Sequence, residues 1–468
     1  MYKFERLALQ LRKLIEQGFW QPQQRLPSLR EQAQHSGYSL MTVMNAYQEL
    51  EAQGLIYANE KSGYFVCEQI IPTQLSSSPL PEIKSEVEVN SMLFQYLKAT
   101  QNENLIGFGS AFPEQALLHH PKLMQILAQH ARHKQSYSSL DSMPPGHLPL
   151  QHLIARRYQL QGIDAHANDI VITSGCLDAL NLSLQAVAKA GDYILLQETI
   201  FYGAWQAAER LGLKVITLPE HPLEGFDLDL FEQCLKNYPI KVCWLMLNAH
   251  NPIGFTVNNK IKAQIAQLLA QYQVHLIEDD VYQELYHGVH KPLTVKHFDR
   301  EQWVLHCSSF SKTLGAGFRV GWVNSAKFSD KIQHLQLMST ISVSPLLQHA
   351  LTEFIATHHY EKHLKILRQQ LERRKKEYYS YLKANLPKVC EVYYYPHGYF
   401  LWVKLPQSLD GMSLYRASLE QHISIAPAKL FSMNQQQQNF IRINCSFEWS
   451  SSIENTLAVL IDLIDQNK

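Results

Sequence analysis

The apolar residues near the N-terminus recur mostly at helical spacing. Ser28, with Glu31 three residues later, forms a capping-box pattern that predicts the start of a helix, and Gly37 predicts its end. Ser39 is the predicted cap of a third helix. An earlier helix, expected to end at Gly18, has apolar residues that recur at helical spacing: Phe4, Leu7, Leu11, Leu14 and Ile15.

Residues 55–69 change to an alternating pattern around Lys61-Ser62-Gly63, which predicts a β-hairpin. Three helices followed by a hairpin predict an α+β winged helix-turn-helix. In such a fold the third helix lies in the DNA major groove, with Ser39 and Thr42 at its start. The hairpin tip, Lys61 to Gly63, would reach a neighbouring groove or phosphate.

Beyond residue 90, apolar runs alternate with helical stretches, which predicts an α/β sheet with helices on both sides. Several runs are apolar on both faces, as in buried and mostly parallel strands. A long helical stretch at 345–385 and short strands at 391–405 and 440–445 predict a smaller α+β subdomain. The expected strands of the large sheet are Ile170–Thr173, Tyr193–Leu196, Lys214–Leu218, Val242–Leu247, Val274–Glu278, Trp303–Cys307 and Arg319–Val323.

Residues 69–90 contain three prolines and a run of serines and predict an extended linker. The expected organisation is a winged domain over 1–68, a linker over 69–90, and a second domain over 91–468. We expect the second domain to divide into a large part at about 105–345 and a small part at about 346–468.

Composition narrows the class of protein. The 468 residues include 42 basic and 42 acidic side chains, and 46% are apolar, which indicates a folded chain with a large core. No apolar run reaches the length of a membrane span. The seven cysteines are scattered without a C-x-x-C motif, which favours reduced thiols and a cytoplasmic location. His359 and His363 lack a third ligand, so we expect no metal site and place them on a solvated helix face.

Charge does not settle whether the winged domain binds DNA. Residues 1–68 carry seven cations and seven anions, although residues 1–30 carry six cations against two acids. Phosphate binding needs local positive potential. A degenerate winged helix that binds another protein therefore remains the alternative.

The segment from Arg25 to Val66 closely resembles the DNA-binding domain of the GntR family. The shared features are Arg25-Leu26-Pro27-Ser28-x-Arg30-Glu31, Thr42-Val43, Ala46-Tyr47, Leu50-Glu51 and Ser62-Gly63. The resemblance implies that Arg30, Ser39, Thr42 and Gly63 contact double-stranded DNA. Leu40 stands where the family usually has an arginine, and leucine cannot read guanine bidentately, so the usual operator preference does not carry over.

Chemically distinctive residues follow the apolar strands of the second domain. Lys312, in Ser309-Phe310-Ser311-Lys312, can act as a desolvated nucleophile, and Arg319 can clamp a phosphate with Ser309 and Ser311. Ligands collect at the carboxyl ends of strands in α/β sheets, which favours a shared site. Pyridoxal 5′-phosphate (PLP) needs such a lysine, together with an acid, a phosphate cup and a stacking ring. The other candidates are Asp279, Tyr282, Asn251, Phe201 and the helix start at Gly175-Cys176-Leu177.

Residues 105–465 resemble fold-type I PLP enzymes, the aspartate aminotransferase superfamily. The resemblance implies that Lys312 forms the internal aldimine and that Asp279 pairs with the pyridine nitrogen. It implies that Asn251 and Tyr282 bind the ring oxygen and that Arg442 binds a substrate α-carboxylate. The stacking pair would be Phe201 and Val281, and the phosphate would be held by Gly175, Cys176, Leu177, Ser309, Ser311 and Arg319. Tyr137 loosely matches a tyrosine that crosses to the partner subunit.

Together the two regions resemble the MocR subfamily of GntR-type bacterial regulators. This implies a PLP-dependent transcriptional regulator that forms a head-to-tail homodimer and senses PLP, an amino acid or an amine through an external aldimine. Two alternatives remain. One is an active aminotransferase with a vestigial winged domain, and the other is a DNA-binding repressor in which PLP is only structural.

Overall fold

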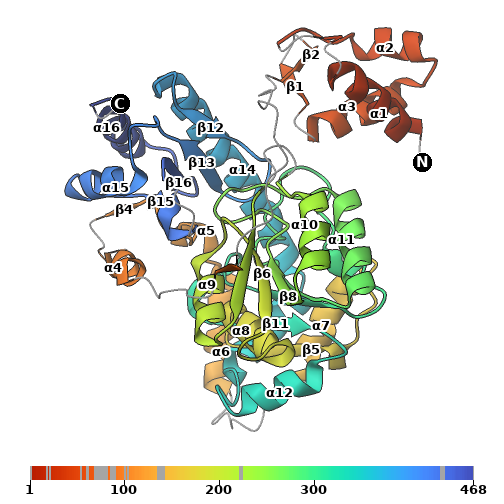
Figure 1. Cartoon of the computed structure of the whole chain (residues 1–468), viewed down its shortest axis with the longest axis vertical. Coiled ribbons are helices and arrows are strands. Elements are labelled where there is room, and N and C mark those ends of the chain that lie inside the picture. The colour runs from red at the N-terminus through yellow and green to blue at the C-terminus, as the bar shows by residue number, and fades with distance from the viewer. Residues whose placement is uncertain are drawn as a thin grey trace. The chain divides into compact units, whose positions relative to one another are not determined.

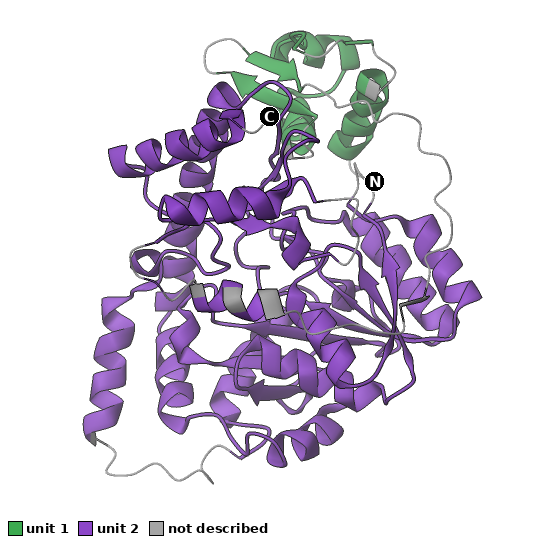
Figure 2. Cartoon of the chain, turned by 60° about the vertical axis from the view of Figure 1, so that its left-hand side comes forward, with its two compact units in different colours: residues 1–78 green, residues 79–468 purple. Residues whose placement is uncertain are grey.

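The first 78 residues form one of two units in the computed structural model, and residues Pro79–Lys468 form the other (Figure 2). The structure describes residues 3–16, 19–20, 23–52, 55–59, 63–67, 83–84, 91–99, 102, 105–133, 143–220, 225–432 and 438–466. Gly18, Lys61 and Tyr137, which the sequence singled out, lie outside these residues, as does most of the expected linker.

The first unit is a winged helix-turn-helix, as predicted. It contains α1 (Lys3–Glu16), α2 (Leu29–Ser36), α3 (Leu40–Ala52) and an antiparallel hairpin of β1 (Ile56–Asn59) and β2 (Gly63–Val66). The capping box is present, because the Glu31 amide donates to Ser28 Oγ and the Ser28 amide donates to the Glu31 carboxylate. Gly37 ends α2 in the left-handed region, with φ of 68°. One apolar core joins all three helices to the hairpin: Leu7, Leu11, Ile15, Leu26, Val43, Tyr47, Leu50, Ile56 and Val66.

An eight-stranded mixed sheet organises the second unit, in the order β3-β7-β6-β8-β9-β10-β11-β5. The five strands from β7 to β10 run parallel, whereas β11 is antiparallel to both of its neighbours. Residues 83–84, inside the expected linker, form β3 against β7. The strands are β3 (Ile83–Lys84), β5 (Ile170–Thr173), β6 (Tyr193–Gln197), β7 (Lys214–Leu218), β8 (Ile240–Leu245), β9 (His275–Asp279), β10 (Val304–Ser309) and β11 (Gly321–Asn324).

Helices cover both faces of this sheet (Figure 1). Strand β6 is apolar on both faces and so needs cover on each. Ile194 and Leu196 belong to the core under α8 and α9, and Leu195 belongs to the core under α10 and α11. The helices of the large part are α5 (Gln115–Leu118), α6 (Pro121–His133), α7 (Leu148–Gln159), α8 (Cys176–Val187), α9 (Tyr202–Arg210), α10 (Leu228–Asn237), α11 (Asn259–Tyr272) and α12 (Ser329–Leu337). Helix α4 (Ser91–Ala99) instead packs into the core of the small subdomain, through Leu93 and Tyr96.

The expected helical stretch at 345–385 is two helices, α13 (Pro345–Ala356) and α14 (His359–Asn385). They are separated at His358, whose φ of 59° is incompatible with a continuous helix. The small subdomain follows as a four-stranded antiparallel sheet in the order β12-β13-β16-β15. Its elements are β12 (Glu391–Tyr393), β13 (Phe400–Lys404), α15 (Gly411–Glu420), β15 (Ala426–Pro427), β16 (Phe440–Asn444) and α16 (Ser451–Gln466), beside the short parallel pair β4 (Ile106–Gly107) and β14 (Ile423–Ser424).

Candidate functional site

Lys312 lies three residues beyond β10, at the carboxyl end of the parallel strands. Its side chain is buried, and its Nζ donates to the Ala111 carbonyl oxygen at 2.8 Å. Burial, reinforced by the positive charge of Arg442, lowers the pKa of Lys312 to about 7. A large fraction of this amine is therefore neutral, and nucleophilic, near neutral pH.

Asp279 ends β9 on the neighbouring strand and is also buried. The Cys176 thiol, at the start of α8, lies 3.7 Å from Asp279 Oδ1. Burial raises the pKa of Asp279 to about 7, and the adjacent Asp280 raises it further while Lys312 opposes the rise. A basic ring nitrogen brought to this carboxylate would share its proton and relieve the cost of burying an unpaired charge.

Asn251 and Tyr282 meet in the same place, with Asn251 Nδ2 at 3.4 Å from the Tyr282 hydroxyl. Arg442, from β16 of the small subdomain, donates Nη1 to Asn251 Oδ1 at 2.5 Å and Nη2 to the Gly109 carbonyl. Its Nε is buried with no hydrogen-bond partner among the described residues. Arg442 thus links the two subdomains and keeps donor capacity for a carboxylate.

The start of α8 provides the candidate phosphate cup. Its first N–H groups have no partners within the helix. Arg319 donates Nη2 to the Ser174 carbonyl at 2.7 Å, and a Cβ on Gly175 would lie 2.9 Å from the Arg319 guanidinium. Arg319 is not the first residue of a strand, as the sequence suggested, because β11 begins at Gly321 and Arg319 has φ of 49°. The conformation directs its guanidinium to the helix start.

Gly321 allows the cup to be this compact. A Cβ there would lie 2.5 Å from the Gly175 carbonyl carbon and 2.7 Å from the Cys176 nitrogen. Ser309 ends β10 and Ser311 lies in the turn that follows, where the Ser311 amide donates to Ser309 Oγ at 3.3 Å. Ser311 Oγ is buried with no partner among the described residues. This orphaned hydroxyl and the glycine-lined cup fit a phosphate.

The expected stacking residues, Phe201 and Val281, are both half-buried and pack against the core that contains Tyr282. Phe201 is the N-cap of α9, and its ring contacts that of Tyr202 at 4.4 Å between centroids. Leu177, expected in the cup, has an exposed side chain on the first turn of α8. It would therefore contribute its backbone.

Sequence reasoning missed the segment from Gly109 to Phe112, in which Ala111 and Phe112 contact Lys312 and Gly109 accepts a hydrogen bond from Arg442. The Lys312 ammonium lies 4.0 Å from the centre of the Phe112 ring, a cation–π distance. Tyr399 donates its hydroxyl to the same Ala111 carbonyl as Lys312, at 2.8 Å. No local motif marks these residues, because they reach the site only through the fold. His363 was also misjudged, since it is buried and its Nε2 lies 2.5 Å from the Thr313 carbonyl oxygen.

In the first unit, the residues expected to contact DNA lie at the start of α3 and nearby. Ser39 Oγ accepts from the Thr42 amide at 3.3 Å, which caps the helix. Arg30 is exposed, and a Cβ on Gly63 would lie 3.3 Å from Arg25 Nε, so Arg25 lies beside the wing. Lys61 was also expected to contact DNA, but the structure does not describe it.

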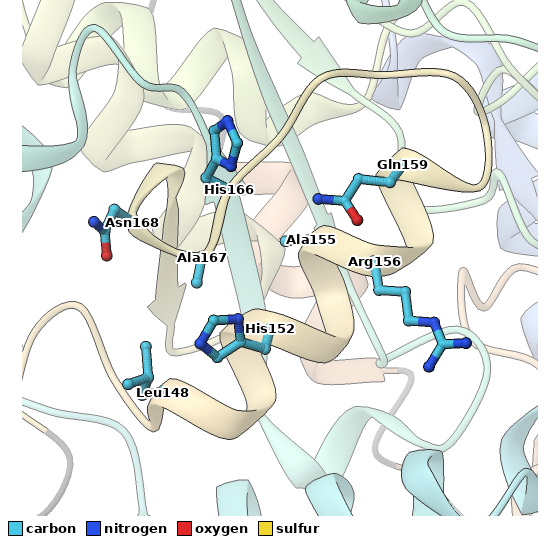
Figure 3. A pocket seen from close by; sticks show the side chains of 8 residues that line it. All are labelled: Leu148, His152, Ala155, Arg156, Gln159, His166, Ala167 and Asn168. Carbon is cyan, nitrogen blue, oxygen red and sulfur yellow. The ribbon is translucent and has the colours of Figure 1, made fainter.

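A separate groove lies on α7 and the turn before β5 (Figure 3). None of its lining residues belongs to the site around Lys312. They are Leu148, His152, Ala155, Arg156, Gln159, His166, Ala167 and Asn168. Within the described part of the chain, no cluster of His, Cys, Asp or Glu is arranged to hold a metal ion, and no helix is long and apolar enough to cross a membrane.

Two protein families match the chain. Residues 3–66 match the bacterial regulatory proteins of the gntR family, and residues 103–455 match aminotransferase class I and II. The chain is 46% identical to the HTH-type transcriptional regulator YdcR of Escherichia coli over 468 residues, which is the full length of both chains. It is 31% identical to YjiR of the same organism, over 98% of this chain and 97% of YjiR. It is 25% identical to the regulator NorG of Staphylococcus aureus, over 92% of this chain and 98% of NorG.

Solved structures match the second unit in fold. An archaeal alanine:glyoxylate aminotransferase has a TM-score of 0.75 and 22% identity, over 81% of this chain and 96% of its own. The Pyrococcus horikoshii kynurenine aminotransferase has a TM-score of 0.74 and 22% identity, over 81% of this chain and 95% of its own. At this identity the likeness shows a shared fold and leaves the chemistry to the residues.

Proposed function

The chain belongs to the family of HTH-type transcriptional regulators that join a gntR-type DNA-binding domain to an aminotransferase class I and II domain, and from this premise we propose that it is a PLP-dependent regulator whose DNA binding responds to a small amine. In this proposal Lys312 attaches PLP covalently, and an amino acid or amine takes the place of Lys312 on the cofactor. The winged domain binds an operator as part of a homodimer, with the subunits arranged head to tail.

One observation carries the cofactor part of the proposal. Lys312 and Asp279 are both buried at the ends of adjacent parallel strands, and burial brings both pKa values to about 7. Shifts of this kind, caused by desolvation beside specific charges, are typical of functional sites. When bound, PLP supplies an electrophilic aldehyde and an electron-accepting ring. The chain supplies the amine, the acid and the phosphate cup.

The remaining groups have separate tasks. Arg319, Ser309, Ser311 and the start of α8 would bind the phosphate, and Asn251 with Tyr282 would bind the ring oxygen. Phe201 and Val281 would enclose the ring and limit access of water. Arg442 would hold a ligand carboxylate, because its Nε remains without a partner among the described residues.

Arg442 also suggests how the ligand can act on DNA binding. It comes from β16 of the small subdomain and bonds Asn251 of the large one at 2.5 Å. A carboxylate bound here would contact both subdomains, and it can shift their relative arrangement only through different affinities for two arrangements. DNA binding would respond through that shift.

A second candidate function is transamination. It is favoured by the same Arg442, because the site has a carboxylate-binding group and a neutral lysine positioned for proton transfer. Steady turnover with a keto-acid acceptor, in protein that has no affinity for DNA, would favour this alternative over regulation.

The test is a footprint of the purified protein on the DNA upstream of its own gene. It is measured without PLP, with PLP, and with PLP plus a pool of amino acids and amines. We expect a protected region that changes with a member of the pool. The Lys312→Ala variant should still protect DNA but should no longer respond to that ligand.

Lys331→Ala is the matched control, because Lys331 also donates to a backbone carbonyl, that of Ala186 at 2.7 Å, but lies outside the site. This variant should respond like the unchanged protein. An unaltered ligand response in Lys312→Ala would overturn the covalent mechanism. Absence of protection under every condition, from protein that shows the absorption band of lysine-bound PLP, would favour the aminotransferase.

A further inference from the structure

A chain of buried polar side chains lies beside Asp279 and is used by none of the steps above. The Trp322 indole Nε1 lies 2.9 Å from the Tyr158 hydroxyl, and that hydroxyl lies 2.6 Å from His306 Nδ1. His306 Nε2 in turn lies 3.0 Å from Asp280 Oδ2. The residues come from β11, α7, β10 and the turn after β9, and all four are at most 7% exposed. Asp280 is the chain neighbour of Asp279.

The donors and acceptors among these four side chains can be assigned from the chemistry of their polar groups. An indole N–H can only donate, so the Tyr158 oxygen accepts from Trp322. Among the described residues, His306 Nδ1 is the only acceptor within reach of the Tyr158 hydroxyl, so the Tyr158 proton is satisfied only when it is donated to that nitrogen. Because that nitrogen is occupied as an acceptor, the imidazole carries its proton on Nε2 and donates it to Asp280. This network of hydrogen bonds therefore holds His306 as one neutral tautomer.

Asp280 thus faces a neutral donor instead of a cation. A second donor, Asn248 Nδ2, reaches the same Oδ2 atom at 3.1 Å. Two donors therefore meet one oxygen of this carboxyl group, while its other oxygen, Oδ1, is buried with no partner among the described residues. The nearest cation in this network is Lys262, which contacts Asp280 only through the Asn248 amide oxygen, at 2.5 Å from its Nζ.

Other charged groups near His306 are already engaged. The Glu278 carboxylate accepts from the Val295 amide at 2.7 Å and from the Lys296 amide at 3.0 Å. Lys296 pairs with Asp299 at 3.1 Å. Asp280 is therefore the carboxyl group that His306 contacts directly, and it is the chain neighbour of Asp279.

We propose that Tyr158 and His306 are positioning residues for the cofactor, which hold Asp280 as a fixed anion and so strengthen the grip of Asp279 on the protonated pyridine nitrogen. This inference rests on the proposed function, because it concerns the group that Lys312 would attach. It goes beyond that function by assigning a role to residues that do not touch the cofactor.

The test is a pH titration of the visible absorption band of lysine-bound PLP in the full-length protein. In Tyr158→Phe, Nδ1 loses its donor and can take a second proton, which gives an imidazolium beside Asp280 and cancels the anion. We expect the midpoint of the titration to move to lower pH, by roughly threefold to tenfold in the proton dissociation constant. The dissociation constant of PLP, measured by fluorescence, should rise severalfold.

The double variant Tyr158→Phe with His306→Gln separates this mechanism from structural damage. Glutamine can still donate to Asp280 but cannot become a cation, so the midpoint should return toward that of the unchanged protein. Damage to packing would not be rescued in this way. If Tyr158→Phe does not fold, His306→Leu serves instead, because it removes a donor from Asp280 and should move the midpoint in the same direction.

Tyr378→Phe is the matched control. Tyr378 is equally buried, and its hydroxyl has no hydrogen-bond partner among the described residues, so the midpoint should not change. Equal midpoints and equal PLP affinities in Tyr158→Phe, His306→Leu and the unchanged protein would overturn the inference. A protein that never develops the band would instead contradict the proposed function, so the two failures can be told apart.

Discussion

The two candidate binding surfaces of this chain differ in how far their side chains are exposed to water. At the start of α3, Leu40 is 49% exposed and Met41 is 62% exposed, and Arg30, in the first turn of α2, is also exposed. Around Lys312, by contrast, the acid, the lysine and the serines are all less than 8% exposed. The first surface is suited to a large, solvated partner, and the second to chemistry on a small one.

This difference predicts how each surface tolerates substitution. Exposed charges are screened by salt and interact weakly, so single changes at the α3 surface should have small effects that depend on ionic strength. Buried groups keep strong electrostatic interactions, and their neighbours are close-packed, so single changes near Lys312 should have large effects.

The largest effect is expected for Gly321→Ala. The added Cβ would lie within 2.8 Å of three backbone atoms, which belong to Gly175, Cys176 and Ser308. Backbone cannot rotate away, so we expect a loss of about 3 kcal/mol in the free energy of unfolding of the second unit. PLP binding should fall with it, because the phosphate cup would open. Chemical denaturation and fluorescence titration measure the two effects.

Gly317→Ala provides the comparison for that variant. A Cβ at Gly317 would have no heavy atom within 4 Å. Stability and PLP affinity should therefore remain unchanged. Equal behaviour of the two variants would show that the close approach at Gly321 does not form the cup.

The next effect concerns pH. In the proposed function, cofactor attachment requires the neutral amine of Lys312, and the lowered pKa of about 7 sets the fraction of Lys312 that is neutral. We expect the rate of attachment to fall about tenfold per pH unit below 7 and to level off above it. Stopped-flow absorbance at fixed PLP concentration measures this rate. A rate that keeps rising to pH 10, as for an exposed lysine, would contradict the desolvated site.

A smaller effect is expected within the first unit. Ser28→Ala removes one of the two hydrogen bonds of the capping box of α2 and should lower the free energy of unfolding of the first unit by about 1 kcal/mol. The loss is small because the variant does not disturb the buried core. Hydrogen exchange of the α2 amides in the full chain should become about fivefold faster. Glu31→Gln retains the box chemistry and should exchange like the unchanged protein.

The smallest effect is expected for Arg30→Ala on the candidate DNA-binding surface. Loss of one phosphate contact should weaken operator binding about threefold at physiological salt and reduce the slope of log affinity against log salt by about one. Fluorescence anisotropy across a salt series measures both. Arg30→Lys should preserve the slope, and an unchanged slope in Arg30→Ala would place Arg30 outside the interface.

The same contrast explains what the sequence could predict. Local patterns located β5 and β7 to the residue, because most residues of these two strands are apolar and buried. They also located the capping box at Ser28. The strand that was predicted to begin at Arg319 begins instead at Gly321, because Arg319 has a left-handed conformation and ends a turn of 3-10 helix.

Contacts distant in sequence left no local pattern. Ala111 and Phe112 meet Lys312 from about 200 positions away, and Tyr158 meets His306 across 148 positions. Each of these residues is ordinary in its own segment. Only the packed sheet shows that a tyrosine of α7 and a histidine of β10 share one hydrogen bond.

The bond between Arg442 and Asn251 has a further consequence for calorimetry. It ties the small subdomain to the large one, so residues 79–468 should melt as one cooperative transition, while the winged unit, with its own core, melts separately. A ligand held at Arg442 would then raise only the melting temperature of the second unit. Scanning a collection of amines by thermal shift can thus identify the effector without knowledge of the operator.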